Sequence, residues 1–179
     1  MFTLNCKGRL LVIDKPLVMG IINATPDSFF GNSRFNGVDE IVAQAEKMLK
    51  DGADIIDIGG QSTRPGSELV SADEEMERVI PSIKTIAEKF PEAFISIDTF
   101  YSKVAAAAVD AGATIINDIS AGSMDNKMIE TVAELKTPYI LMHMKGTPQT
   151  MQQNTVYENL TRDVLDFFIS KTHQDAFVH

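Results

Sequence analysis

Polar side chains stand at the ends of short apolar runs in this sequence. Asp98 ends one run, and Asn117 and Asp118 end the next. Burying a carboxylate is costly, so Asp98 either has a hydrogen-bond partner or awaits a ligand, although an aspartate here also commonly caps the next helix. Strand alternation sends Asn117 and Asp118 to opposite faces, so one faces a pocket. A carboxylate and an amide at neighbouring strand ends suit a flat heterocycle that carries both donors and acceptors.

Two loops carry further candidate groups. The first follows the first apolar run and is longer than a usual connection of about two to six residues, which favours a functional loop over a simple Pro-Asp turn. The second has two glycines, two hydroxyls and a guanidinium, which suit an anionic group. A flexible loop with a surface arginine and no ligand is an equally good interpretation of the same residues. The candidate residues are Asn23, Thr25, Pro26, Asp27 and Phe29 in the first loop, and Ser62, Thr63, Arg64 and Pro65 in the second.

Two residues that often bind metals are isolated here. His143 ends the fifth apolar run and is more typical of a packed core histidine than of a ligand. No second His or Cys lies at metal-ligand spacing, so zinc is not expected. Cys6 is the single cysteine, which excludes an internal disulfide and indicates a reducing, cytoplasmic setting.

Composition excludes several classes of protein. The 179 residues hold 25 acidic and 16 basic side chains, a formal net charge of −9, which argues against nucleic-acid binding. The hydrophobic content of 44% indicates an ordinary globular protein, and we expect one domain over residues 1–179. No apolar run approaches the roughly 18 residues of a membrane span, and charges interrupt any leader at the start.

The elements that would position these groups alternate in type. Short Ile- and Val-rich runs, expected to be apolar on both faces, alternate with segments of helical period, which is the βαβ pattern. A short hairpin around Lys7-Gly8 precedes them, Ser71 with Glu74 predicts a capping box, and Pro81 is expected to kink its helix or lie in an early turn. The predicted strands are 18–22, 54–58, 94–97, 114–117 and 139–143, after hairpin strands 4–6 and 9–13, and helical stripes cover 41–49 and 76–90, with a further helix from Ser102 and a last one near 168–179.

Two α/β architectures fit this pattern, an open doubly wound sheet and part of a TIM (β/α)₈ barrel. A ring of polar groups at the strand ends is typical of the barrel. Five βα units are three fewer than a barrel needs, so we expect a barrel truncated after the fifth unit.

Five strings resemble one enzyme family. MGIINATPDSF, GADIIDIGGQSTRPG, SIDT, GATIINDIS and MHMKGTPQTMQ, in this order from about Val18 to Tyr157, are similar to the dihydropteroate synthases, which are pterin-binding TIM barrels. The resemblance implies a transferase of folate biosynthesis. It would join 6-hydroxymethyl-7,8-dihydropterin diphosphate to 4-aminobenzoate, giving 7,8-dihydropteroate and pyrophosphate.

The resemblance also implies roles for individual residues. Asn23 would ligate the Mg²⁺ that accompanies the diphosphate, and Asp98 and Asn117 would hydrogen-bond the pterin ring. The first loop would close over the substrates, while the second would form the aminobenzoate site, where sulfonamides compete near Phe29 and Pro65. The implied catalytic residues are Asn23, Thr63, Arg64, Asp98 and Asn117, and Thr25, Pro26, Asp27, Phe29, Ser62, Pro65 and Met142 complete the implied substrate-binding set.

The sequence departs from the family pattern in three places. Phe30-Gly31-Asn32 replaces the usual Asp and paired glycines, and Gln61 replaces a Glu, a change expected to matter little because an acceptor remains. Strands six to eight, with their Asp, Lys and Arg-x-His groups, are missing, so we expect little or no synthase activity from this chain alone. The full-length family is usually dimeric. A pterin-binding methyltransferase-type domain and a non-catalytic partial barrel stay open as alternatives.

Overall fold

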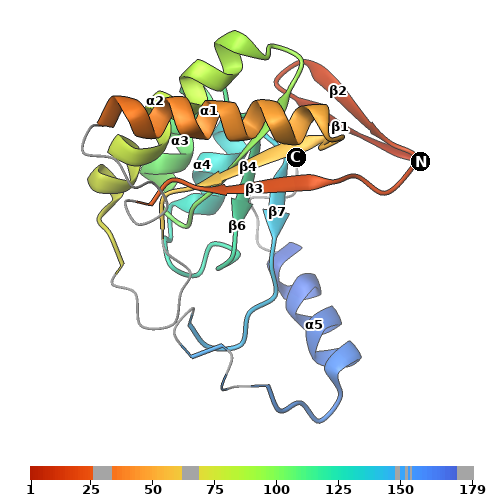
Figure 1. Cartoon of the computed structure of the whole chain (residues 1–179). Coiled ribbons are helices and arrows are strands. Elements are labelled where there is room, and N and C mark those ends of the chain that lie inside the picture. The colour runs from red at the N-terminus through yellow and green to blue at the C-terminus, as the bar shows by residue number, and fades with distance from the viewer. Residues whose placement is uncertain (26–33, 62–68, 148–149, 152, 154, 173–179) are drawn as a thin grey trace.

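The structure is a computed structural model that describes residues 1–25, 34–61, 69–147, 150–151, 153 and 155–172. The described residues form a two-stranded hairpin, a five-stranded sheet and five helices (Figure 1). Predictions that fall on residues 26–33 and 62–68, which include most of both loops, lie outside the described part of the chain.

The five-stranded sheet is parallel throughout, and its strands follow one another in chain order. A doubly wound sheet reverses direction at a switch point, whereas a barrel adds each strand beside the last. The order therefore selects the barrel architecture over the open sheet. The strands are β3 (Met19–Asn23), β4 (Ile55–Gly59), β5 (Phe94–Asp98), β6 (Ile115–Asp118) and β7 (Tyr139–Leu141).

Helices pack on one face of this sheet, here called the outer face (Figure 1). Ile58, Ile97 and Ile116 are fully buried there, against helix residues such as Ala45 and Ile83. Burying a side chain of this size contributes about 1.5–3 kcal/mol, so this face supplies most of the core. The helices are α1 (Arg34–Lys50), α2 (Ala72–Lys89), α3 (Ser102–Ala111) and α4 (Met128–Leu135), followed by α5 (Leu160–Thr172).

The hairpin closes the amino end of the opposite, inner face. Strands β1 (Phe2–Cys6) and β2 (Arg9–Ile13) pair antiparallel, and Lys7 (φ 56°) and Gly8 (φ 87°) take the positive φ values of a tight hairpin turn. Cys6 and Leu11 pack against Ile55 and Ile115 of the sheet. The predicted hairpin is confirmed, and it leaves only the carboxyl end of the inner face for polar groups.

The predicted strands are confirmed to within two residues at each end. The claim that they are apolar on both faces is wrong, because Asp57 and Ser96 lie within β4 and β5 and are buried. Helix α2 continues through Pro81 at its middle instead of holding it in an early turn, and Ser71 accepts from the Glu74 amide as predicted. Helix α4 is implied by the five predicted βα units, although no residue range was predicted for it.

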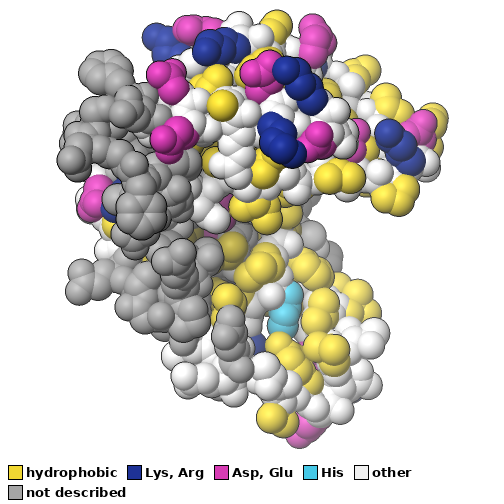
Figure 2. Space-filling view, viewed as in Figure 1, with side chains coloured by type: hydrophobic (Ala, Val, Ile, Leu, Met, Phe, Trp, Pro, Cys, Tyr) yellow, Lys and Arg dark blue, Asp and Glu magenta, His cyan; other side chains and the backbone are white. Residues whose placement is uncertain are grey.

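The last helix overlaps the region near 168–179 where the chain was expected to end. It spans Leu160–Thr172, and none of its described residues is buried. His143 packs against it, with its ring centroid 4.9 Å from that of Phe167 in an edge-on arrangement. Figure 2 shows the histidine in cyan among apolar side chains in this part of the molecule. The interpretation of His143 as a packing residue therefore agrees with its surroundings.

No helix in the described ranges has both the length and the apolar character that crossing a membrane requires.

Candidate active site

Strand register assembles the candidate groups into rows on the inner face. Asn23 pairs with Gly59, Gly59 with Asp98, and Asp98 with Asn117, so the four share one row at the carboxyl edge. Register partners in a parallel sheet point to the same face and lie about 4.8 Å apart across neighbouring strands. The structure thus brings together Asn23, Asp98 and Asn117, which the sequence had placed only at separate strand ends.

A second row lies one step deeper. Asp57 is paired with Ser96, between Ile21 on β3 and Ile115 on β6. Asp57 is 3% exposed, and its Oδ2 accepts a hydrogen bond of 3.2 Å from Asn117 Nδ2. Within the described residues its Oδ1 and the Ser96 hydroxyl have no hydrogen-bond partner. Two buried polar atoms are therefore left over at the floor of the site, as expected where a polar ligand binds.

Asp57 is the functional candidate that the sequence reasoning missed. It was counted as part of an apolar strand, although its spacing from Gly59 places it on the same face as the carboxyl-edge row. Burial raises its pKa, and the hydrogen bond from the Asn117 amide partly offsets that effect. Because residues two apart in a strand share a face, the position of Asp57 two residues before Gly59 is sufficient to predict that it lies on the inner face.

Asp98 is the most perturbed carboxyl group of the site. Its pKa is raised to about 7, first by burial and then by repulsion from Asp57, Glu75 and Asp118. In the described part of the chain no donor hydrogen-bonds to its carboxylate, and the helix that follows takes its cap from Asp125 Oδ2 through the Ser102 amide (2.7 Å). Asp98 therefore does not cap that helix and can present a proton or a negative charge to a ligand near neutral pH.

Asp118 shows the opposite environment on the outer face. Its carboxylate is fully buried and accepts from the amides of Ser120 (2.7 Å) and Gly122 (2.8 Å) and from the Tyr139 hydroxyl (2.6 Å). The prediction that Asn117 and Asp118 face opposite layers is confirmed. Asp118 is a structural group, since its hydrogen bonds hold the loop after β6 together.

Three more predicted residues lie at the same edge of the sheet. Asn23 is exposed at the end of β3, with Thr25 partly buried two residues on. Met142 directly follows β7 and is also partly buried. Among the described residues no group of three or more His, Cys, Asp or Glu side chains forms a metal site, so any metal here would need other ligands.

The remaining predicted residues cannot be placed. Pro26, Asp27, Phe29 and the stretch Ser62 to Pro65 lie outside the described residues. The glycines before that stretch have structural reasons for their small size. A Cβ on Gly59 would stand 3.3 Å from Asp98 Oδ2, and one on Gly60 only 2.8 Å from Glu75 Cγ. Besides allowing a ligand to approach, as the sequence predicts, these glycines make room for the side chains of Asp98 and Glu75.

A sheet built in barrel order, with helices outside and polar rows inside its carboxyl edge, defines a class of barrel enzyme sites. Residues 19–176 match the sequence family described as pterin binding enzyme. The chain belongs to this family.

Individual relatives give the same result. The dihydropteroate synthase of Haemophilus influenzae is 42% identical over 171 residues, which are 96% of this chain and 62% of that protein. Among solved structures, the Yersinia pestis dihydropteroate synthase in a sulfonamide drug complex superposes with a TM-score of 0.86 at 39% identity and covers 97% of this chain and 62% of its own. The Xanthomonas albilineans enzyme in complex with 7,8-dihydropteroate gives 0.82 at 35%, with 98% and 61% covered.

These matches confirm the family resemblance and the TIM-barrel type. The chain spans about three fifths of the length of each of these three relatives, 61–62%.

Proposed function

We propose that this chain acts in the dihydropteroate synthase reaction and that the inner face of its sheet binds the pterin ring. The reaction condenses 6-hydroxymethyl-7,8-dihydropterin diphosphate with 4-aminobenzoate. One observation carries the proposal: Asp57, Asp98 and Asn117 converge on one face of the carboxyl edge, with buried oxygens left unpartnered. An aminopyrimidinone edge offers the N–H groups and acceptors that two carboxyl groups and an amide can read.

The chemistry requires little covalent help from the protein. An electron-rich dihydropterin stabilises positive charge at its exocyclic methylene as the C–O bond to diphosphate breaks. The amine nitrogen then forms the C–N bond and releases a proton, and because an aniline nitrogen is already nucleophilic we assign no general base. The described residues therefore orient the pterin, and Thr63 and Arg64 of the second loop would contact the amine partner and the leaving diphosphate.

Mg²⁺ is part of this proposal. Asn23 offers a carbonyl oxygen, which suits a hard cation, and its exposed position at the strand end leaves room for water and diphosphate oxygens to complete the coordination. Bound Mg²⁺ would neutralise charge on the leaving group. We place the reaction in the cytoplasm, with a homodimer as the assembly to test, and sulfonamides as competitors of the amine substrate.

Fluorescence titration with 6-hydroxymethylpterin tests the proposal. We expect saturable binding to this chain, and a loss of about tenfold or more in affinity for Asn117→Ala, because a buried amide partner of the ring is lost. Asn159→Ala, which removes an exposed amide near α5, serves as the matched control. Absence of saturable binding, or equal affinities for the two variants, would contradict the proposal.

Turnover is a separate question. The expectation that the 179 residues have little or no synthase activity alone stays a prediction, and pyrophosphate release from the purified chain measures it. Preferential binding of a methylated folate over the diphosphate substrate would instead favour the methyltransferase-type alternative.

A further inference from the structure

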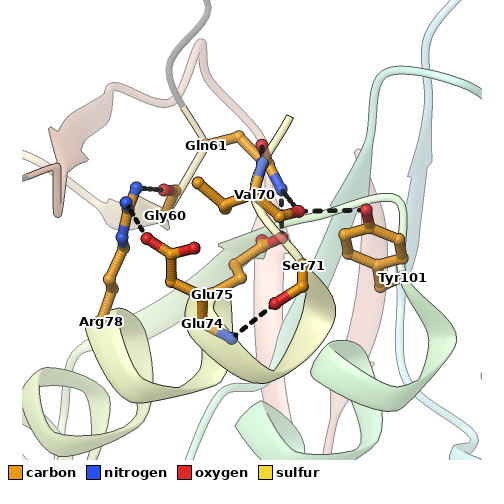
Figure 3. Close-up of polar contacts among 8 residues, drawn as sticks. All are labelled: Gly60, Gln61, Val70, Ser71, Glu74, Glu75, Arg78 and Tyr101. Carbon is orange, nitrogen blue, oxygen red and sulfur yellow. Dashed lines mark hydrogen bonds and ion pairs between the residues drawn. The ribbon is translucent and has the colours of Figure 1, made fainter. Parts of the chain in front are cut away.

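The chain on either side of residues 62–68 is held by one side chain. Gln61 Oε1 accepts from the Val70 amide (3.2 Å), and Gln61 Nε2 donates to the Val70 carbonyl (3.1 Å). Gln61 is only 8% exposed. Figure 3 shows this side chain reaching across to Val70. Its two hydrogen bonds to the Val70 backbone therefore join the chain before residue 62 to the chain after residue 68.

Helix α2 fixes the position of the Gln61 side chain. The second proton of Gln61 Nε2 points to Glu75 Oε2 (2.9 Å), and Glu75 is fully buried. Arg78 donates to the Gly60 carbonyl (2.8 Å) from the next turn of the same helix (Figure 3). Because a Cβ on Gly60 would meet Glu75 Cγ at 2.8 Å, the backbone lies directly on the helix and has no room to shift.

The far end of the stretch has its own supports. The Tyr101 hydroxyl, just before α3, donates to the Val70 carbonyl (3.1 Å), and Ser71 caps α2 through the Glu74 amide (3.2 Å) (Figure 3). Elements from two βα units, β4–α2 and β5–α3, therefore converge on residues 60–61 and 69–71. Such a connected polar cluster favours one local arrangement, although Glu75 Oε1 has no hydrogen-bond partner among the described residues.

We propose that Gln61 and Glu75 form a positioning pair that sets where the second loop leaves and rejoins the barrel edge, and that the amide at position 61 keeps this anchor independent of pH. The inference deepens the proposed function, because this loop carries Ser62, Thr63 and Arg64, but its first test needs no substrate.

The choice of amide at 61 follows from the surroundings. A glutamate there, as in the usual family pattern, would place its carboxylate about 3 Å from that of Glu75, and two such groups cannot both ionise without strong repulsion. The expectation that Gln61 merely keeps an acceptor is thus too weak, because its two N–H donors make two of its three hydrogen bonds. The groups that face Glu75 are Gln61, Thr99, Arg78, Tyr101 and Asp98.

Burial raises the pKa of Glu75, while the side chains of Gln61 and Thr99 and the charge of Arg78 lower it. The substitution Gln61→Glu would place a second carboxylate beside the buried Glu75, and Arg78 is the one cation among the described residues that lowers the pKa of Glu75. In the Gln61→Glu variant we therefore expect the contact between position 61 and Val70 to hold at low pH, where the introduced carboxyl group and Glu75 share a proton. We expect this contact to break as the pH rises and both carboxyl groups ionise.

Amide hydrogen exchange at Val70 reads the anchor directly. In the wild type we expect equal protection at pH 6 and pH 8 after correction for intrinsic rates. For Q61E we expect a loss of about tenfold or more between pH 6 and pH 8, while Ile116, whose amide donates to Pro138 O within the sheet, keeps its protection. The double variant Q61E/E75Q restores an amide–carboxylate pair and should recover to within about threefold with no pH dependence.

Two further variants keep the test decisive. Q61A removes both bonds to Val70 without adding a charge and should cost about tenfold in Val70 protection at both pH values. E74Q changes the neighbouring exposed carboxylate and should change Val70 by less than about twofold. Unchanged Val70 protection in Q61A, or a double variant as poorly protected as Q61E, would overturn the proposal.

The link to function has a separate readout. Q61A should keep the affinity for 6-hydroxymethylpterin within about twofold and lower the affinity for 4-aminobenzoate measured with pterin and pyrophosphate present, because only the loop is displaced. Equal losses for both ligands would overturn the positioning role. If the wild type binds no pterin, the proposed function fails while the Val70 exchange result stands.

Discussion

The two faces of the same five strands are built from different kinds of residue. The outer face stacks buried isoleucines under the helices, whereas the inner face places Asp57, Ser96, Asp98 and Asn117 toward the carboxyl edge. The outer face gains free energy from every apolar side chain that it removes from water. The inner face loses some of it, because it buries carboxyl groups that lack enough donors. Because successive residues of a strand point to opposite faces, the residues that stabilise the fold alternate with the residues that could bind a ligand.

The same separation appears in two neighbouring aspartates. Asp118 on the outer face has three donors within 2.8 Å, while burial, followed by repulsion from three carboxylates, raises the pKa of Asp98 on the inner face. The first organises a loop and the second is available to a ligand. Two aspartates at the ends of adjacent strands thus take opposite roles because of the direction in which each side chain points.

The largest expected effect comes from the outer face. Ile97→Ala should lower the free energy of unfolding by about 3 kcal/mol, since a fully buried side chain leaves a cavity under α2 and α3. Ile21→Ala is the matched control on the inner face, where the side chain is 59% exposed, and should cost less than about 1 kcal/mol. Urea unfolding at pH 7 measures both, and equal losses would contradict the assignment of the faces.

Asp98→Asn should have the opposite sign. The folded-state pKa of Asp98, about 7, lies above the unfolded value of 3.8, so its protonated form is favoured in the folded state. Its contribution is present below pH 4 and is lost as the pH rises to about 7. At pH 8 the variant should gain on the order of 2 kcal/mol and lose the pH dependence of this window.

Asp118→Asn is the matched control for that change. An amide oxygen cannot replace a carboxylate that accepts three hydrogen bonds, so this variant should be destabilised at pH 8. Denaturant titrations at pH 4, 6 and 8 compare the two. A loss of stability in Asp98→Asn at pH 8 would show that its carboxylate has native partners.

Tyr139→Phe should cost about 1.5 kcal/mol, because the hydroxyl hydrogen-bonds to a buried carboxylate at 2.6 Å. Tyr157→Phe, whose ring instead packs under Lys145 near α5, should change stability by less than about 0.5 kcal/mol. Thermal or urea unfolding distinguishes them. A negligible effect of Tyr139→Phe would mean that Asp118 is satisfied by the loop amides alone.

Asp57→Asn should produce the smallest change, a gain of about 1 kcal/mol at pH 8. The amide can still accept from Asn117, and its nitrogen replaces a buried oxygen that has no donor among the described residues. Ser96→Ala, its register partner, should be neutral within about 0.5 kcal/mol, because the removed hydroxyl is also unpartnered there. Destabilisation of both would indicate a hydrogen-bonded Asp57–Ser96 pair instead.

Much of this arrangement could be predicted from the sequence. Hydrophobic runs located the five strands, and period-two alternation correctly opposed Asn117 and Asp118. The motifs at the strand ends pointed to the family. Asp57 was missed because a single polar residue in a strand rich in isoleucine was treated as apolar, although its register with Asp98 through Gly59 follows from the same alternation.

Other features depend on contacts between distant parts of the chain. Nothing near Asp118 in the sequence shows that Tyr139, 21 residues later, supplies its third donor. In the same way, Gln61 meets Glu75 only once α2 lies against the end of β4. Local patterns predict which face a residue occupies, while the hydrogen-bond partners that decide its role are set by packing.

The central claim is that a pterin binds on the inner face. Isoleucine methyl NMR during titration with 6-hydroxymethylpterin tests it most directly, because the two faces carry different isoleucines. The account predicts shifts at Ile21, Ile115 and Ile140, none at Ile56, Ile58 and Ile97, and a response in Asn117→Ala only at about tenfold or more higher ligand concentration. Shifts at the outer-face methyls, or an unchanged response in Asn117→Ala, would contradict it.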